Sequence, residues 1–414
     1  MNVARTLAAL GVVTVLLTGC AAPGEPAETG PEPAVWGVES ASFPLPESLA
    51  TAEYVGGFSA GGVLWVYDST RDAPPVLHGT RDGVEWVTLD LVAAGLPADA
   101  FLGSDSHCPV SRAIEDRGEE FTIVYATWYG GSHSSGLANR FFLVDIDTAA
   151  MEVLGISDAA ENGLEVMPPA AASDGYNFRT YCIAGFARLG GTRLAVGGGQ
   201  WWLPYLTSTA DGFVATEDAS GRWSVRSEDG APFYRTLRVQ PAGVFPVGDV
   251  LVVPSKRYDA PSGFDAWVSA DGVSWEHIQT PGPVPGYYDL NAVAGPAGIV
   301  VVAPTEDPEA IYAWSSADGR SWTAVRLSES ERMAPGFLVA TEDGYVAGFE
   351  DGFDMRILTS ADGVEWVPVE QDEAPPIWLR YAFRHGTGLV SVSKDAILTT
   401  GLDWSQPTED DDAE

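Results

Sequence analysis

The sequence predicts an all-β fold, a propeller of seven four-stranded antiparallel blades, with six blades as the alternative count. Nearly the same heptapeptide recurs, as S-A-D-G-V-S-W at 269–275, S-A-D-G-R-S-W at 316–322 and S-A-D-G-V-E-W at 360–366, with a close copy at 80–86. The tryptophans of the three later copies lie 47 and 44 residues apart, and periods of this size are typical of repeat folds. No segment shows a long apolar period of 3.6 residues, so we expect few helices.

One repeat shows the predicted blade in detail. Short apolar runs bounded by turn residues predict four strands, at 336–341, 345–349, 355–360 and 366–369. The Asp-Gly pairs at 343–344 and 362–363 predict the two hairpin turns between them, because glycine tolerates a positive φ and the Asp side chain bonds nearby backbone. The preceding unit repeats this order, with strands expected at 290–294, 299–303, 311–315 and 322–327.

Each heptapeptide is therefore expected to form the turn between the third and fourth strands of a blade, with its tryptophan packed between blades. The expected structural residues are Asp82, Gly83, Trp86, Asp271, Gly272, Trp275, Asp318, Gly319, Trp322, Asp362, Gly363 and Trp366. This pattern resembles the Asp-box, or BNR repeat, of sialidase-like propellers, Ser-x-Asp-x-Gly-x-Thr-Trp, although the spacing from Asp to Gly is one residue shorter. The resemblance covers roughly residues 50–404 and implies that the boxes lie away from the ligand face.

The remaining blades are less regular. The second has no copy of the turn, only 143–148 leading to Val153, and the copies at 216–223 and 399–404 are degraded. The long linker 156–182 is why a six-blade count remains open. We expect a strand near 35–42 to complete the last blade, since closing the ring removes exposed strand edges.

The N-terminal segment predicts a lipid anchor. Residues 1–19 carry one basic residue, Arg5, and an apolar run too short to span a bilayer. The run ends in Leu-Thr-Gly-Cys, which resembles the lipobox of bacterial lipoproteins and implies lipidation of Cys20; an ordinary signal peptide is the alternative. We expect a flexible Pro/Ala/Glu linker at 20–35, the propeller at 36–406 and a disordered acidic tail at 407–414. The mature protein is expected on the extracytoplasmic face of the cell membrane.

Two further cysteines, Cys108 and Cys182, are expected to form a disulfide outside the reducing cytosol. Metal binding by Cys108 with His107 is the weaker alternative, because no C-x-x-C pair accompanies them.

Charge and composition limit the classes of molecule that the protein could bind. Asp and Glu number 58 against 22 Lys and Arg, a net charge of −36, so the chain should repel nucleic acid. We expect a monomer without cofactor or metal, although the acidic stretch 350–354, or Asp105 with Asp116, could hold Ca²⁺.

The ligand face is expected at the end of the blades opposite the heptapeptide turns, where long loops carry aromatic and charged residues suited to a glycan or an envelope protein. The alternative for each aromatic is a filler between blades. The candidates are Tyr129, His133, Trp201, Trp202, Tyr205, Arg257, Tyr258, Tyr287, Tyr288, Trp378 and Arg380.

Catalysis is the competing hypothesis. The resemblance implies a sialidase-like exo-glycosidase with an arginine triad, for which Arg140, Arg179, Arg257 and Arg380 are available. The Arg-Ile-Pro stretch that opens such catalytic domains is missing, and nothing singles out a nucleophilic Tyr-Glu pair. The five histidines are scattered and suit structural hydrogen bonds; they are His78, His107, His133, His277 and His385. The sequence therefore favours a non-catalytic binding or scaffolding module.

Overall fold

The structure is a computed structural model. It describes residues 40–70, 73–100, 102, 114–127, 140–159, 161, 180–189, 192–200, 212–217, 223–227, 239–257, 261–286, 290–306, 309–328, 333–351, 354–369, 382–386, 388–393 and 396–400. Contacts divide the chain into two units, 1–33 and 34–414, and every described residue belongs to the second.

The strands of the described residues form seven antiparallel sheets, which we number I to VII. Sheet I comprises β2 (Val55–Ala60), β3 (Val63–Asp68), β4 (Val76–Thr80) and β5 (Val87–Asp90). Sheet II comprises β6 (Ile114–Asp116), β7 (Glu120–Thr127), β8 (Arg140–Asp147) and β9 (Glu152–Asp158). Sheet III comprises β10 (Thr180–Leu189), β11 (Thr192–Gln200), β12 (Gly212–Glu217) and β13 (Trp223–Ser227).

Sheet IV has an interrupted first strand and therefore five elements, β14 (Val239–Pro241), β15 (Phe245–Val247), β16 (Val250–Arg257), β17 (Asp265–Ser269) and β18 (Glu276–Gln279). Sheet V comprises β19 (Asn291–Gly295), β20 (Gly298–Glu306), β21 (Glu309–Ser316) and β22 (Thr323–Ser328). Sheet VI comprises β23 (Met333–Ala340), β24 (Tyr345–Asp351), β25 (Asp354–Ser360) and β26 (Val367–Pro368). Sheet VII comprises β27 (Phe383–His385), β28 (Gly388–Val392), β29 (Ile397–Thr400) and, from the start of the domain, β1 (Ser40–Phe43).

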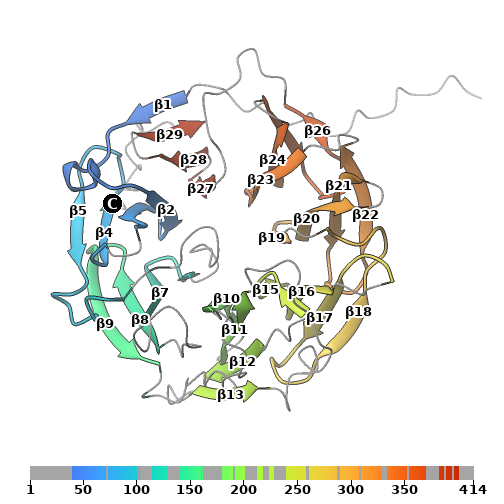
Figure 1. Cartoon of the computed structure of the whole chain (residues 1–414), viewed down its shortest axis with the longest axis horizontal. Coiled ribbons are helices and arrows are strands. Elements are labelled where there is room, and N and C mark those ends of the chain that lie inside the picture. The colour runs from blue at the N-terminus through green and yellow to red at the C-terminus, as the bar shows by residue number, and fades with distance from the viewer. Residues whose placement is uncertain are drawn as a thin grey trace, which may run out of the picture. The chain divides into compact units, whose positions relative to one another are not determined.

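Contacts between first strands link neighbouring sheets in a cycle. β10 contacts β6 and β15, β19 contacts β15 and β23, and β27 contacts β23 and β2. Sheets I and II share one apolar cluster, which completes the cycle. Figure 1 shows the sheets arranged radially around a centre. The predicted all-β propeller of four-stranded antiparallel blades is confirmed, and the only helix in the described residues is a short 3₁₀ turn, η1 (Glu47–Leu49).

The predicted closing strand is also observed. β1 pairs antiparallel with β29, with Ser40 opposite Thr400 and Phe43 opposite Ile397. The last sheet therefore takes its fourth strand from the beginning of the domain. This pairing covers the edge of β29, which an open sheet would leave with unpaired backbone groups.

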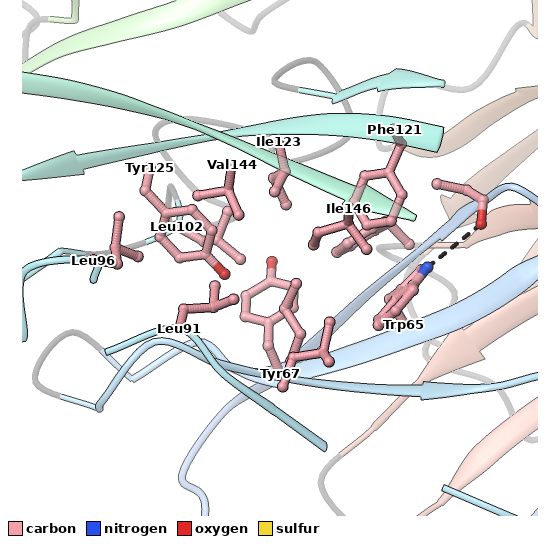
Figure 2. Packing of buried hydrophobic residues seen from close by; sticks show 14 of the residues in the cluster. Trp65, Tyr67, Leu91, Leu96, Leu102, Phe121, Ile123, Tyr125, Val144 and Ile146 are labelled. Atoms are coloured by element: carbon pink, nitrogen blue, oxygen red, sulfur yellow. Dashed lines mark hydrogen bonds between the residues drawn. The ribbon is translucent and has the colours of Figure 1, made fainter. Parts of the chain in front are cut away.

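Aromatic side chains fill the junction between sheets I and II. Phe121 of β7 packs against Trp65 of β3, with ring centroids 5.3 Å apart, and both are fully buried. Figure 2 shows these rings together with Tyr67 and Tyr125 in one apolar cluster, and a bond from Trp65 Nε1 to the carbonyl oxygen of Ala60. Burial of such large rings supplies much of the apolar area that holds two blades together.

The heptapeptides form the turns between third and fourth strands, as predicted, and we call them the Asp-Gly-Trp turns (80–86, 269–275, 316–322 and 360–366). In the last of them, Asp362 Oδ1 accepts the backbone N–H of Val364 at 2.8 Å and of Glu365 at 2.9 Å. The Ser360 hydroxyl donates to the same oxygen and accepts the N–H of Gly363. One carboxylate and one hydroxyl thus satisfy three turn N–H groups that would otherwise have no partner in the turn.

The other three turns repeat these contacts. Asp82, Asp271 and Asp318 each accept two backbone N–H groups and the hydroxyl of the residue two positions earlier. Asp318 also accepts the hydroxyl of Ser321. Hydrogen bonds from the N–H groups of Ser274 and Val273 lower the pKa of Asp271 to about 2. Partial burial tends to raise the pKa of Asp362, but its backbone N–H donors outweigh that effect and lower it. The ionised carboxylate is therefore part of the folded turn.

The turn glycines serve a second purpose, since each packs against the preceding sheet of the cycle. Gly319 has φ +71°, and a Cβ added there would lie 2.5 Å from Val252 Cγ2 of sheet IV. At Gly363 the added atom would lie 2.5 Å from Val300 Cγ2 of sheet V. A glycine is needed for the left-handed backbone and for this close approach.

The turn tryptophans are less buried than the sequence suggested. Trp86, Trp275, Trp322 and Trp366 are half-buried, whereas Trp65 and Trp314 are fully buried within the sheets. Each turn tryptophan directly precedes the fourth, outermost strand of its sheet, whereas Trp65 and Trp314 lie on second and third strands. Trp322 still packs edge-on against Phe264, which directly precedes β17 of sheet IV, with 5.2 Å between ring centroids.

Sheet II lacks an Asp-Gly-Trp turn and uses other contacts. Asp147 accepts the N–H of Ala150 at 2.8 Å, and Met151 takes the positive φ of 50°. Arg81, from the turn of sheet I, donates to the carbonyl oxygen of Thr148 at 2.7 Å. These contacts form the turn before Val153 without a copy of the heptapeptide.

Replacing Asp362 with alanine should lower the free energy of unfolding by about 0.5–2 kcal/mol, the range for lost side-chain caps of backbone N–H groups. Neighbouring Glu365 is exposed and is the matched control, because Glu365→Ala removes the same charge without removing a turn acceptor. Urea unfolding of both variants checks this. Equal stability of the two variants would contradict the structural role of the carboxylate.

Candidate functional site

The two ends of the blades differ in the connections that lie there. Registers of Leu251 with Ser269, Ile299 with Ser316 and Tyr345 with Ser360 place the Asp-Gly-Trp turns beside the hairpins that join first and second strands. We call this end the turn face. At the opposite end, which we call the loop face, second strands lead to third strands, as where Thr127 pairs with Arg140.

The strands that flank every predicted ligand-binding segment end on the loop face, as expected. These segments connect β7 to β8, β11 to β12, β16 to β17, β18 to β19 and β26 to β27. Most of the candidates lie outside the described residues, namely Tyr129, His133, Trp201, Trp202, Tyr205, Tyr258, Tyr287, Tyr288, Trp378 and Arg380. Arg257 is the last residue of β16, and only its backbone is described.

The predicted lipidation and disulfide residues are similarly placed. Cys20 and Cys108 lie outside the described residues, and Cys182 is described only by its backbone, as the third residue of β10.

Arg140 is the predicted arginine whose side chain is described, at the loop-face end of β8. It forms an ion pair with Asp158 of β9 and lies 3.7 Å from Glu161. Its guanidinium also lies 5.6 Å from the ring centroid of Phe142. These partners fix the arginine along the sheet, and two acidic neighbours reduce its capacity to bind a further carboxylate.

Sheet IV carries a polar cluster near the loop face that sequence reasoning missed. The carboxylate of Asp265 is 1% exposed and lies 3.0 Å from Nε2 of His277. The imidazole packs against Trp267, with ring centroids 4.5 Å apart. Register places Asp265 opposite Ser255 of β16, which is fully buried. The signal available in the sequence was a lone carboxylate in the otherwise apolar run 264–268.

The carboxylate 3.0 Å from one ring nitrogen and the neighbouring Trp267 ring restrict the position of the imidazole. The His277 side chain is 38% exposed, so its other nitrogen can reach solvent or a ligand. Among the described residues, His277 has no hydrogen bond to a hydroxyl or thiol that could serve as a nucleophile. The arrangement is suited to donating or accepting a hydrogen bond at the mouth of the loop face.

Two other histidines are structural, as the sequence suggested. His78 is buried between the hydroxyls of Ser48, at 3.1 Å, and Thr88, at 2.9 Å, and burial lowers its pKa. His385 Nδ1 lies 2.8 Å from the Ser59 hydroxyl and joins the last sheet to the first. Burial lowers the pKa of His385 to about 4, so the ring is neutral at pH 7.

The predicted calcium alternative gains no ligand set from the described residues. Asp116 accepts the N–H groups of Gly61, at 3.0 Å, and Gly118, at 2.8 Å, and therefore caps two hairpins. No group of three potential metal ligands occurs within the described part of the chain. The same residues include no helix with the length and hydropathy of a membrane span.

No protein-family model and no curated protein matches this sequence. Similar solved structures include the β-propeller domain of the Trilobed protease from Pyrococcus furiosus, at 12% identity and TM-score 0.43, covering 86% of this chain and 99% of that one. Pyrococcus horikoshii acylaminoacyl peptidase matches at 10% identity and TM-score 0.47, over 86% of this chain and 52% of that one. The extracellular domain of a proposed one-component system from B. thetaiotaomicron matches at 10% identity and TM-score 0.46, over 87% of this chain and 39% of that one. This chain spans about half or less of the last two proteins, and these low scores carry no conclusion about activity.

Replacing His385 with glutamine should flatten the pH dependence of stability between pH 6.5 and 4. In this window the unfolded histidine binds a proton and the folded one does not, so the stability of the wild type falls as the pH falls, by roughly 3 kcal/mol in total. Urea unfolding at pH 7, 5.5 and 4 measures the effect. Parallel pH profiles for wild type and variant would contradict burial of a neutral His385.

Proposed function

We propose that this protein is a lipid-anchored, extracytoplasmic propeller whose blades are the seven sheets and whose loop face binds a glycan or an envelope protein without catalysis. The leader and Cys20 support the anchor, and the cyclic contacts of the sheets support a ring of seven. The Asp-Gly-Trp turns support kinship with the Asp-box propellers, since their polar side chains are engaged in turn hydrogen bonds.

The position where the chain joins the propeller is the observation that carries this proposal. Ser40 starts β1 opposite Thr400, and Thr400 pairs in turn with Leu389, directly after the hairpin of β27 and β28. The N-terminal segment therefore enters the domain on the turn face. The loop face is left at the opposite end of the blades, away from the attachment of the tether.

The chemistry of the loop segments supports recognition of an extended polar surface. Tryptophan and tyrosine rings stack on the apolar faces of sugars or on peptide side chains, and neighbouring charges orient the ligand. The described part of this face adds an imidazole oriented by Asp265 and an arginine, Arg140, that is held by two acidic residues. An exo-glycosidase of the sialidase type is the second candidate, supported by the resemblance of the turns alone.

Contacts near β6 support the proposed disulfide. Cys182 lies on β10, which contacts β6, and Cys108 precedes β6 by a few residues in the sequence. A bridge across 182 − 108 = 74 residues would add up to ~4 kcal/mol in the chain-entropy description.

The double variant Trp201→Ala with Trp202→Ala should lose ligand binding by at least tenfold while the propeller stays folded. The soluble domain from residue 21 would be applied to a glycan array and to envelope proteins in pull-down assays. Val84→Ser is the control, since Val84 is exposed on the turn face and should bind as wild type. Hydrolysis of a fluorogenic sialoside by the wild type, or unchanged binding by the double variant, would contradict the proposal.

A further inference from the structure

Five Asp-Gly pairs lie in the described residues, and one of them differs from the other four in its hydrogen bonds. Four belong to the Asp-Gly-Trp turns, and the fifth, Asp343-Gly344, lies in the hairpin between β23 and β24 on the turn face. All five aspartates are exposed, and each is followed by a buried glycine with a positive φ. The hydrogen bonds of each turn are therefore the feature that separates the five pairs.

An Asp-Gly pair can rearrange because no side chain hinders the approach of the glycine nitrogen to the carboxyl group before it. The nitrogen bonds to the aspartate Cγ, the carboxyl hydroxyl leaves as water with the proton of the nitrogen, and a succinimide ring forms. Water then opens the ring. When the bond between the nitrogen and the main-chain carbonyl carbon breaks, the chain continues through Cγ as isoaspartate, with no net gain or loss of atoms. Ring closure is fastest when the carboxyl group is protonated and free to rotate.

The Asp-Gly-Trp turns oppose both requirements. In the last of them, two backbone N–H groups and the Ser360 hydroxyl hold one oxygen of Asp362, and the N–H of Gly363 donates to that hydroxyl at 2.8 Å. The glycine N–H groups of the turns at 80–86 and 269–275 are engaged in the same way. The pKa of each of the four aspartates is lowered, by backbone N–H donors that in Asp362 outweigh the effect of burial, so little carboxylic acid is present near neutral pH.

The hairpin that contains Asp343 is held by a threonine instead. Thr341 donates its N–H to the carbonyl oxygen of Gly344 at 2.8 Å, and the Thr341 hydroxyl accepts the N–H of Asp343 at 3.3 Å. Among the described residues, no N–H or hydroxyl group donates to the carboxylate of Asp343. This carboxyl group can therefore rotate towards the Gly344 nitrogen without breaking a hydrogen bond of the turn.

From this difference we propose that Asp343 is a site of spontaneous isomerisation, where the folded protein converts aspartate into isoaspartate while the four Asp-Gly-Trp turns stay intact. The product adds one carbon atom to the main chain directly after Glu342, whose carboxylate accepts a bond from Nη2 of Arg384 at 2.7 Å. Because Arg384 belongs to β27, the modification lies at the contact between sheets VI and VII. It is independent of binding at the loop face.

The test incubates the domain from residue 21 at pH 6 and 37 °C and follows each Asp-Gly pair by peptide mapping, with fragmentation that distinguishes aspartate from isoaspartate. We expect isoaspartate to accumulate at Asp343 at least tenfold faster than at the other four positions. In urea-unfolded protein the five rates should agree within about threefold, since the pairs are then chemically alike. Asp343→Glu should abolish the reaction at this position alone, and Asp343→Asn should form isoaspartate faster, with loss of ammonia.

Ser360→Ala tests the cause of the difference, because it removes the hydroxyl that binds Asp362 and accepts the N–H of Gly363. Isoaspartate should then rise at least threefold at Asp362 and stay unchanged at Asp343, with urea unfolding showing that the variant is folded. Several outcomes would overturn the proposal. They are no isoaspartate at Asp343 in the folded protein, equal rates at all five pairs, the same tenfold difference in urea, or no rise at Asp362 in Ser360→Ala.

Discussion

The close packing of a turn glycine against the preceding sheet is the constraint on which the ring depends. Gly83, Gly272, Gly319 and Gly363 all have positive φ, between 71° and 76°, and an atom added at each would contact a side chain of the sheet before it. Asp and Ser or Thr side chains hold the turn in that shape. A single heptapeptide therefore closes a hairpin and also fixes the distance between two blades.

The junctions without these turns use other contacts: apolar clusters join sheets I and II and sheets VI and VII, whereas ion pairs join sheets II and III. Between sheets II and III, the buried carboxylate of Glu115 lies 2.8 Å from Arg188 Nε and 2.9 Å from Arg193 Nε. Removing one partner of such a buried pair leaves a charge without compensation, which typically costs 3–5 kcal/mol. The ring thus combines four junctions that contain a turn glycine, two apolar junctions without one, and the junction between sheets II and III, where a buried ion pair lies.

Much of the fold could be predicted because residues close together in the sequence determine the turns and strands of each repeat. The Asp-Gly turns, the four strands per unit and the closing strand follow from short-range patterns, and all are observed. The turn of sheet II was harder to predict, since Asp147 and Met151 form it without a glycine. The pairs Glu115–Arg193, Asp265–His277 and Ser59–His385 join residues distant in sequence, and no local pattern marks such contacts.

The candidate binding surfaces likewise include features that could be predicted from the sequence and features that could not. Loop-face residues could be assigned from connectivity, because alternate hairpins of a blade must open at opposite ends. The pair of Asp265 and His277 could not, since it depends on the register of β17 and β18, which no local pattern sets.

The most direct measurement compares Gly319→Ala with Gly248→Ala by urea unfolding. Both glycines have positive φ, 71° and 60°, so both variants carry the cost of a left-handed alanine, about 1 kcal/mol. Only at Gly319 does the new methyl meet the preceding sheet, at 2.5 Å from Val252, whereas Gly248 faces open space. We expect Gly319→Ala to cost roughly 1–3 kcal/mol more, as for an overpacked core. Equal losses in the two variants would contradict the account that these glycines hold neighbouring blades together.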